Sequence, residues 1–242
     1  AEGKYFTGCA SDDILLPSKI SLLVEKLESS DDSYSVAFGD AIFIDDNSNE
    51  VFIDRKTGEY TTEENGFKFF LDYYTFERDF DYKDEKSFGS YKTLLAGNYL
   101  PAMSYVIKLD KIREVGAWTS GNTIEDWEMW LKLSKNYKFA YIDEPVAFYR
   151  WHDSNTCKTM KFELVRDSIQ LFENEREYAL NRSYEDILYS TLVNMIIQLR
   201  IHDKTLFIKK FFKYSINPAF ICAFTIKIFN KIKKSIKNSI FN

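Results

Sequence analysis

The chain has 242 residues, of which 45% are hydrophobic and 17% aromatic, with only nine glycines and four prolines. This composition supports a substantial folded core and excludes a largely disordered chain. The formal net charge of −5 conceals an asymmetry, because all 37 acidic residues precede Lys204 whereas residues 204–242 contain nine lysines and no acid.

Three cysteines, Cys9, Cys157 and Cys222, have no CxxC spacing and favour a reducing compartment over a disulfide framework. The N-terminus lacks a basic region followed by an apolar run, so no signal peptide is predicted. No uninterrupted apolar run of about 20 residues occurs, so no membrane-spanning helix is predicted either.

The first elements alternate between strand and helix. Residues 3–6 predict a strand, and residues 14–28 predict a helix because apolar residues recur three or four positions apart. These residues are Ile20, Leu23, Val24 and Leu27. Pro17 suits the first turn of this helix, and Ser18 or Asp13 is placed to cap it.

The middle of the chain continues this mixture. Residues 35–45 (SVAFGDAIFID) predict a strand, and the turn that follows leads into VFID, which indicates a hairpin. Further predicted elements are a short helix near residues 66–74, a strand at 104–110, a short helix ending at Gly116, a helix at 124–136, and strands at 139–145 and 146–152 around Pro145. From about residue 160 the pattern is helical. Mixed strands and helices followed by helices alone predict an α/β domain with a C-terminal helical extension.

Two adjacent acids, Asp12 and Asp13, follow the first predicted strand. Neighbouring residues of a strand point to opposite faces, so these carboxylates converge only where the strand ends. One interpretation is a site for Mg²⁺ or Mn²⁺ that also binds a diphosphate, because such ions accept carboxylates and phosphate oxygens. The other is a polar turn in which Asp13 caps the next helix, and this stretch alone favours the turn.

Two longer segments favour the metal-site interpretation over the polar turn. Residues 3–20, GKYFTGCASDDILLPSKI, resemble the pattern G-K-Y-I-x-x-L-D-x-D-D-x-x-x-P-x-K-L of family 2 glycosyltransferases, which have the GT-A fold. Residues 115–156 resemble V-G-G-F-D…E-D-W-D-x-W-L-R-L…Y-x-x-x-Y-I-x-E-P-L-x-x-Y-R-x-H-x-x-N of the same family. The resemblance covers about residues 1–158, and two separated matches in the family's order are more specific than an isolated D-x-D.

The resemblance implies a GT-A-like, Rossmann-related mixed sheet flanked by helices. Residues 1–158 would be the C-terminal part of that domain, residues 159–203 a helical extension, and residues 204–242 a basic amphipathic tail. Two departures stand out: the first aspartate of the family's D-x-D-D is Ala10 here, and the N-terminal nucleotide-binding half of the family is not covered. On this interpretation the chain is a fragment, or an upstream part is missing from it.

For the acid pair, the resemblance implies that Asp13 ligates a divalent metal, Mn²⁺ or Mg²⁺, while Asp12 shares the metal or contacts the ribose of the donor. It also implies that Arg150 and His152 bind the donor's diphosphate or the metal. These two residues alternate in YRWHDSN and therefore share one face of an extended segment. The alternative is that His152 is structural.

The resemblance further implies that Asp126 is the general base that deprotonates the acceptor hydroxyl, with Glu125 as its supporting neighbour. The alternative is that Thr123 caps the following helix together with Asp126, in a variant of the capping box. The two interpretations are compatible, because a capped acid is also a positioned acid.

The lysine-rich tail, residues 204–242, predicts a helix for a membrane interface. Ile226, Phe229, Ile232 and Ile236 form one apolar stripe, and Lys231, Lys233, Lys234 and Lys237 lie mostly beyond it. Anionic lipid is the favoured partner over nucleic acid, which the acidic remainder of the chain would repel. The alternative is that Phe and Ile pack on the domain while the lysines face water.

Together these features predict an inverting, metal-dependent glycosyltransferase, with inversion and donor class taken from the resemblance. It would transfer a sugar from a nucleotide-diphosphate-sugar, a UDP-sugar above all, to a surface glycan that is lipid-linked or a polysaccharide. The expected location is the cytoplasmic face of a bacterial membrane. The alternative is a non-catalytic fragment or degenerate relative that acts as a binding or assembly module, which Ala10 and the uncovered N-terminal half favour.

Overall fold

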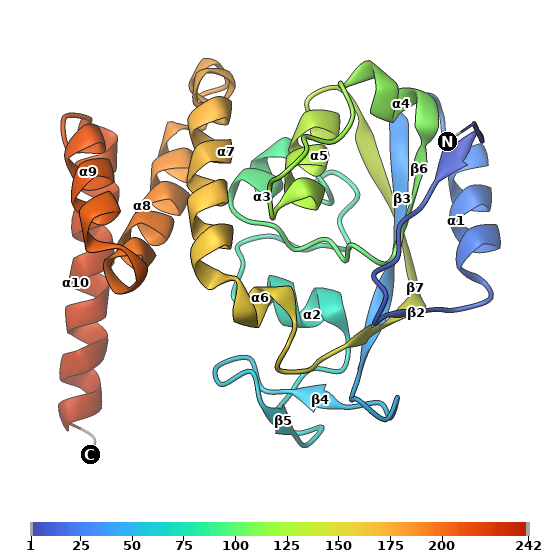
Figure 1. Ribbon diagram of the computed structural model, residues 1–242, viewed down its shortest axis with the longest axis horizontal. Coiled ribbons are helices and arrows are strands. Elements are labelled where there is room, and N and C mark those ends of the chain that lie inside the picture. The colour runs from blue at the N-terminus through green and yellow to red at the C-terminus, as the bar shows by residue number, and fades with distance from the viewer. Residues whose placement is uncertain (1, 241–242) are drawn as a thin grey trace. The chain divides into compact units, whose positions relative to one another are not determined.

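The computed structural model describes the backbone of residues 2–240 and the side chains of residues 2–233 (Figure 1). The chain forms two compact units. The sheet unit comprises the described residues up to Gly121 and Glu125–Thr159, and the helical unit comprises Asn122–Ile124 and the described residues from Met160 onward.

A five-stranded mixed sheet organises the sheet unit, with strand order β1-β6-β3-β7-β2. The strands are β1 (Tyr5–Phe6), β6 (Tyr105–Lys108), β3 (Tyr34–Ile44), β7 (Lys138–Arg150) and β2 (Ile14–Leu15). Only the β3–β7 pair is parallel. All residues of β3 are buried, as expected for a central strand covered on both faces, and its prediction from SVAFGDAIFID is confirmed.

Helices cover both faces of this sheet (Figure 1). Helix α1 (Lys19–Glu28) packs on one face, where Leu23 and Leu27 join a core with Ala37 and Val146. The other helices of the unit are α2 (Phe70–Thr75), α3 (Tyr91–Leu95), α4 (Leu109–Glu114), α5 (Glu125–Ser134) and α6 (Thr156–Thr159). The unit is therefore a mixed α/β structure with a sheet flanked by helices.

Residues 14–28 differ from their prediction. The helix starts only at Lys19, because Ile14 and Leu15 form β2 against β7. Ser18 occupies the N-cap position without a side-chain hydrogen bond to the helix. Ile20 is exposed and Lys19 is buried instead, so the predicted apolar face was wrong at that position.

Strand β7 also corrects a prediction, since it continues through Pro145 where two strands were expected. Asp40 of β3 pairs with Pro145, and the register shifts on both sides of Asp40. Proline cannot donate a ladder hydrogen bond, which accounts for an irregularity here. Gly39 permits the close approach, because a Cβ there would lie 2.7 Å from the carbonyl oxygen of Glu144.

The predicted hairpin after β3 is only partly formed. Ile44 and Glu50 make one antiparallel bridge, whereas β4 (Phe52–Ile53) pairs with β5 (Tyr60–Thr61) in a separate two-stranded sheet.

The helical unit contains α7 (Lys161–Asn181), α8 (Glu185–His202), α9 (Lys204–Tyr214) and α10 (Pro218–Ile240). Fully buried side chains from three of these helices form its core: Phe172, Leu188, Leu192, Ile196, Leu199 and Phe220. The side chain of Asp203 accepts a hydrogen bond from Leu206 N and caps α9. Within the described residues, no helix is both long and apolar enough to cross a membrane. Lys234, Ile236 and Lys237 of the predicted tail stripe lie outside the described side chains.

Candidate functional site

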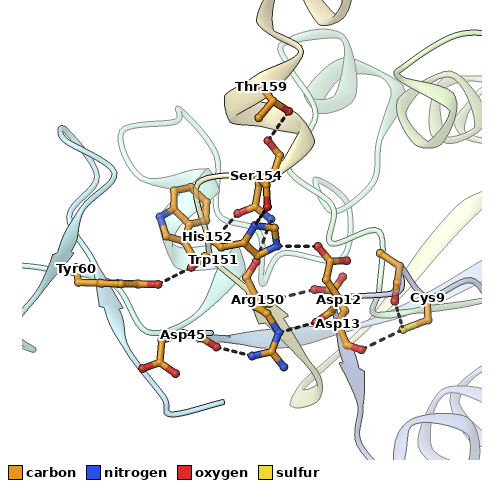
Figure 2. Close-up of polar contacts among 12 residues, drawn as sticks. Cys9, Asp12, Asp13, Asp45, Tyr60, Arg150, Trp151, His152, Ser154 and Thr159 are labelled. Carbon is orange, nitrogen blue, oxygen red and sulfur yellow. Dashed lines mark hydrogen bonds and ion pairs between the residues drawn. The ribbon is translucent and has the colours of Figure 1, made fainter. Parts of the chain in front are cut away.

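The segment from Thr7 to Asp13 joins β1 to β2 and carries the acid pair; it is called the acid loop below. Because β2 runs antiparallel to β7, with Ile14 opposite Phe148, the loop reaches the end of β7. Figure 2 shows Asp12 and Asp13 beside Arg150 and His152. Residues about 140 positions apart in the chain thus form one polar cluster.

Each acid has a defined partner in this cluster. The Oδ1 atom of Asp13 accepts a hydrogen bond from Arg150 N at 3.0 Å, and Oδ2 of Asp12 lies 2.9 Å from His152 Nε2. Both aspartates are half-buried. The structure therefore brings together the four residues that the resemblance assigned to metal and diphosphate.

The Arg150 guanidinium is directed at the protein itself. Its Nε donates to the Asp12 carbonyl oxygen at 2.9 Å, its Nη1 to the Asp45 carbonyl oxygen, and its Nη2 to Ser48 Oγ at 3.0 Å. These contacts join the acid loop to the turn after β3. Arg150 therefore positions the acid loop, and its binding of a diphosphate stays a prediction.

Two residues without a predicted role, Ser154 and the asparagine that ends the family pattern, Asn155, complete the cluster. Ser154 Oγ lies 2.8 Å from His152 Nδ1, and Asn155 Oδ1 accepts a hydrogen bond from His152 N at 2.7 Å. The buried Asn155 also donates from Nδ2 to the Arg150 carbonyl oxygen at 3.0 Å. An asparagine three residues after a histidine at a strand end was the available signal, because Asn commonly bonds to nearby backbone.

Burial raises the pKa of Asp13 to about 6. The hydrogen bond from Arg150 N opposes this shift, the charge of Asp12 adds to it, and the charges of Arg150 and His152 oppose it. The net rise means that the ionised carboxylate is incompletely compensated within the protein.

The acid pair could bind a hard cation only together with ligands from a substrate and water. Among the described residues, no group of three or more His, Cys, Asp or Glu side chains is arranged to hold a metal ion. Mg²⁺, however, is commonly bound through one or two carboxylates, with substrate phosphates and water as the other ligands. Oδ1 of Asp12 and Oδ2 of Asp13 accept no hydrogen bond from the described residues, so two carboxylate oxygens are available for such a site.

A buried lysine anchors the base of the acid loop. Lys19 Nζ donates to Thr7 Oγ1 at 2.7 Å and to the Met103 carbonyl oxygen at 2.8 Å. Burial lowers the pKa of Lys19 to about 8. A lysine in the first turn of a helix ordinarily faces water, so sequence periodicity gave no sign that Lys19 would point into the protein.

The second predicted constellation lies at the start of α5. Asp126 Oδ2 accepts a hydrogen bond from Asn98 Nδ2 at 2.9 Å, and Oδ1 accepts one from Trp127 N at 2.6 Å. Burial raises the pKa of Asp126 to about 6; these two hydrogen bonds oppose the rise and the charge of Glu125 adds to it. Glu125 itself is exposed. A carboxylate with this pKa suits proton transfer near neutral pH.

The alternative in which Thr123 caps helix α5 is wrong. Thr123 directs both its backbone N and its Oγ1 to Asp167 Oδ2, at 3.0 Å each. Its side chain therefore does not cap α5.

Tyrosines of the sheet unit connect Asp126 with the acid loop. Burial raises the pKa of Tyr105, and the charges of Asp126 and Glu125 add to this effect. The Tyr105 hydroxyl also lies close to Gly8 of the acid loop, because a Cβ atom at Gly8 would be 2.8 Å from the hydroxyl oxygen.

A second connection runs through Tyr74 and Tyr149. Burial raises the pKa of both tyrosines; the charge of Asp126 contributes for Tyr74, and the charges of Tyr74 and Asp13 contribute for Tyr149. Both rings pack against Phe70, at centroid distances of 4.2 and 5.4 Å. The two tyrosines thus belong to one aromatic group, in which Tyr74 responds to the charge of Asp126 and Tyr149 to that of Asp13.

No protein-family model matches the chain, and no curated protein matches it significantly.

A cavity of about 530 Å³ lies elsewhere in the sheet unit, between the ends of β1, α1 and β6 and the start of α4. Its lining includes Lys4, Glu28, Lys108 and Arg113 and none of the predicted site residues. Its position gives no support to any of the predicted roles.

Proposed function

We propose that the sheet unit is part of a GT-A glycosyltransferase domain of family 2 that transfers a sugar from a nucleotide-diphosphate-sugar to a glycan hydroxyl with inversion. One observation carries the proposal: the two segments that resemble the family meet in the structure, where Asp13 Oδ1 accepts a hydrogen bond from Arg150 N at 3.0 Å and Asp12 Oδ2 lies 2.9 Å from His152 Nε2. The raised pKa values of Asp13 and Asp126 are consistent with it, because shifted pKa values are common at functional sites.

In this proposal Asp126 accepts the proton of the acceptor hydroxyl as its oxygen bonds to the anomeric carbon of the sugar. The bond from that carbon to the diphosphate oxygen breaks, and its electron pair leaves with the nucleotide diphosphate. The hydrogen bonds from Asn98 and Trp127 N hold the Asp126 carboxylate in a fixed orientation. A divalent ion held by Asp13 and Asp12 would supply positive charge for the departing diphosphate.

A binding module without catalysis is the second candidate. The observation in its favour is Ala10, which removes one carboxylate from the acid loop. Such a module would retain the positioning contacts of Arg150 and His152 and bind the donor without turnover.

The experiment is a screen of nucleotide-sugars for hydrolysis and transfer, with Mn²⁺, with Mg²⁺ and with a chelator. Asp126→Asn should lower turnover by at least about 10²-fold but keep donor binding, and Asp13→Asn should raise the metal concentration that half-maximal turnover requires. Asp32→Asn is the matched control, since its side chain is fully exposed. Donor binding without turnover in the parent protein would favour the module, and turnover unchanged in both variants would contradict the assignment.

A further inference from the structure

The last helix exposes large apolar side chains to solvent. On α10, Ile221, Ile226, Ile228, Phe229 and Ile232 are exposed, with exposed fractions of 65% for Phe229 and 53% for Ile232. Isolated exposed apolar residues are ordinary, but several on one helix indicate an interaction surface.

These residues form a face of α10 that its packing does not use. Ile221, Ile228, Phe229 and Ile232 are spaced i, i+7, i+8 and i+11, which gathers them on one side of a helix. The packing face is different: Phe220 is fully buried, and Phe224 contacts the ring of Phe211 at 5.0 Å. Lys227 and Lys231 continue the line of Phe220 and Phe224 and so border the apolar face on one side.

Helix α9 repeats this pattern. Ile208, Phe212 and the following Ile216 are spaced four residues apart, and Phe212 and Ile216 are 68% and 88% exposed. Lys209 and Lys213, which are also exposed, flank this row. The exposed residues of α9 and α10 named here are called the lysine-apolar surface below.

The charge of this segment is of one sign. Residues 204–242 contain nine lysines and no acid, whereas the rest of the chain has 23 Lys and Arg against 37 Asp and Glu. Lys210 and Lys213 are paired with Glu173 at 2.8 Å. In the described part of the chain, Lys209, Lys227 and Lys231 make no ion pair. The surface therefore presents apolar rows and uncompensated positive charge together.

We propose that the lysine-apolar surface binds the surface of an anionic lipid bilayer. Its isoleucines and phenylalanines would enter the boundary between headgroups and acyl chains, and its lysines would contact anionic headgroups. This binding needs neither donor nor acceptor and is independent of the proposed transferase activity.

Charge decides between this partner and two others. A second copy joined through the same surface would bring two acid-free lysine segments together, which is electrostatically unfavourable. A nucleic acid would attract the lysines but would offer no apolar phase for Phe212, Phe229 and Ile232.

The test is sedimentation of the full chain with vesicles of phosphatidylcholine alone, and with vesicles of equal parts phosphatidylcholine and phosphatidylglycerol. Binding should require phosphatidylglycerol and weaken with added salt. The double variant Phe229→Glu/Ile232→Glu should bind at least about tenfold more weakly, because it removes apolar contacts and adds repulsion. Lys227→Gln/Lys231→Gln should lose about fivefold per lysine.

The matched control is Ile20→Glu/Phe76→Glu, which makes the same change at two exposed apolar positions of the sheet unit. It should bind the vesicles like the parent protein. The substituted side chains are exposed, so circular dichroism should show unchanged helix content in both double variants. Equal binding to phosphatidylcholine alone, equal losses in the control, tighter binding to an oligonucleotide, or dimerisation that depends on Phe229 would each overturn the proposal.

Discussion

Partly or fully buried acids of the two units differ in how their charge is compensated: Asp13, Asp126 and Asp40 in the sheet unit, and Glu173 in the helical unit. In the sheet unit, burial raises the pKa of Asp13 and Asp126 to about 6 and that of Asp40 to about 7. In the helical unit, burial also acts to raise the pKa of Glu173, but hydrogen bonds from Lys210, Lys213 and Tyr214 outweigh it and lower this pKa to about 2. All three bonds reach Oε1 of Glu173 at 2.7–2.8 Å.

Glu173 differs from Asp13 and Asp126 in the groups that compensate its charge. Glu173 has two lysine ammonium groups and a phenol to compensate its charge, whereas Asp13 and Asp126 have mainly neutral amide donors. A carboxylate without a nearby cation destabilises the folded protein unless a proton, a metal ion or a substrate compensates its charge. The contrast assigns Glu173 a structural role and leaves the charges of Asp13, Asp126 and Asp40 less compensated within the protein.

The largest expected effect is on catalysis. Asp126→Asn should lower kcat by about 10²- to 10⁴-fold, because the amide cannot accept the acceptor's proton. Asn98→Ala should lower kcat less and shift the acidic limb of the pH–rate profile upward, since it removes one hydrogen bond that favours the ionised Asp126. Steady-state kinetics across pH measures both. An Asn98→Ala profile identical to that of the parent protein would remove Asn98 from the site.

The next largest effect is on the stability of the helical unit. Glu173→Ala should lower the free energy of unfolding by about 2 kcal/mol, because it leaves Lys210 and Lys213 together without their acid. Urea denaturation followed by circular dichroism measures the change. Glu177→Ala, at an exposed position of the same helix, is the control and should change stability little. Equal losses in the two variants would mean that Glu173 contributes through helix propensity alone.

Opposite pH dependences should follow from Asp40 and Glu173. The folded pKa of Asp40 lies above its unfolded value, so the folded state holds more protons and stability should fall by about 3 kcal/mol as pH rises from 4 to 7. The contribution of Glu173 is present above its unfolded pKa and is lost as pH falls toward 2. Denaturation across pH should show the Asp40 slope in the parent protein and not in Asp40→Asn; the same slope in both would assign it elsewhere.

The smallest effect tests how the acid loop is held. In Gly8→Ala the new methyl group would lie 2.8 Å from the Tyr105 hydroxyl, so the ring or the loop must shift, at a cost of about 1 kcal/mol. Thermal denaturation and donor KM measure the result. We expect a modest loss of stability and a raised KM. Gly116→Ala is a useful comparison because its new methyl group would meet none of the described side chains within 4 Å, although the backbone φ of +91° adds strain of its own.

The parts of the fold predicted correctly are those with strong local signals. The buried run of β3, the helix after Ile124 and the helical end of the chain follow from apolar periodicity. Strand β2 has two residues and exists because β7 lies beside it, which no local pattern reveals. Strand β7 continues through Pro145 because β3 adjusts its register at Asp40, so tertiary pairing overrides the local signal of proline.

The candidate site shows the same division. Asp12, Asp13 and Asp126 were found because their segments resemble a known family. Asn98 and Lys19 are positioned by contacts between distant segments, although Lys19 occupies the lysine of the family pattern quoted above, and Ser154 contacts His152 two residues away.

The contacts of Arg150 bear on how mutagenesis of this cluster is interpreted. Its guanidinium crosslinks the acid loop to the turn at Asp45, so Arg150→Ala would free both segments as well as delete a charge. An inactive Arg150→Ala protein is therefore no proof of contact with a donor. Arg150→Lys combined with hydrogen exchange at Asp12 and Asp13 separates the two causes, because loss of anchoring accelerates exchange of the loop amides before any ligand is added.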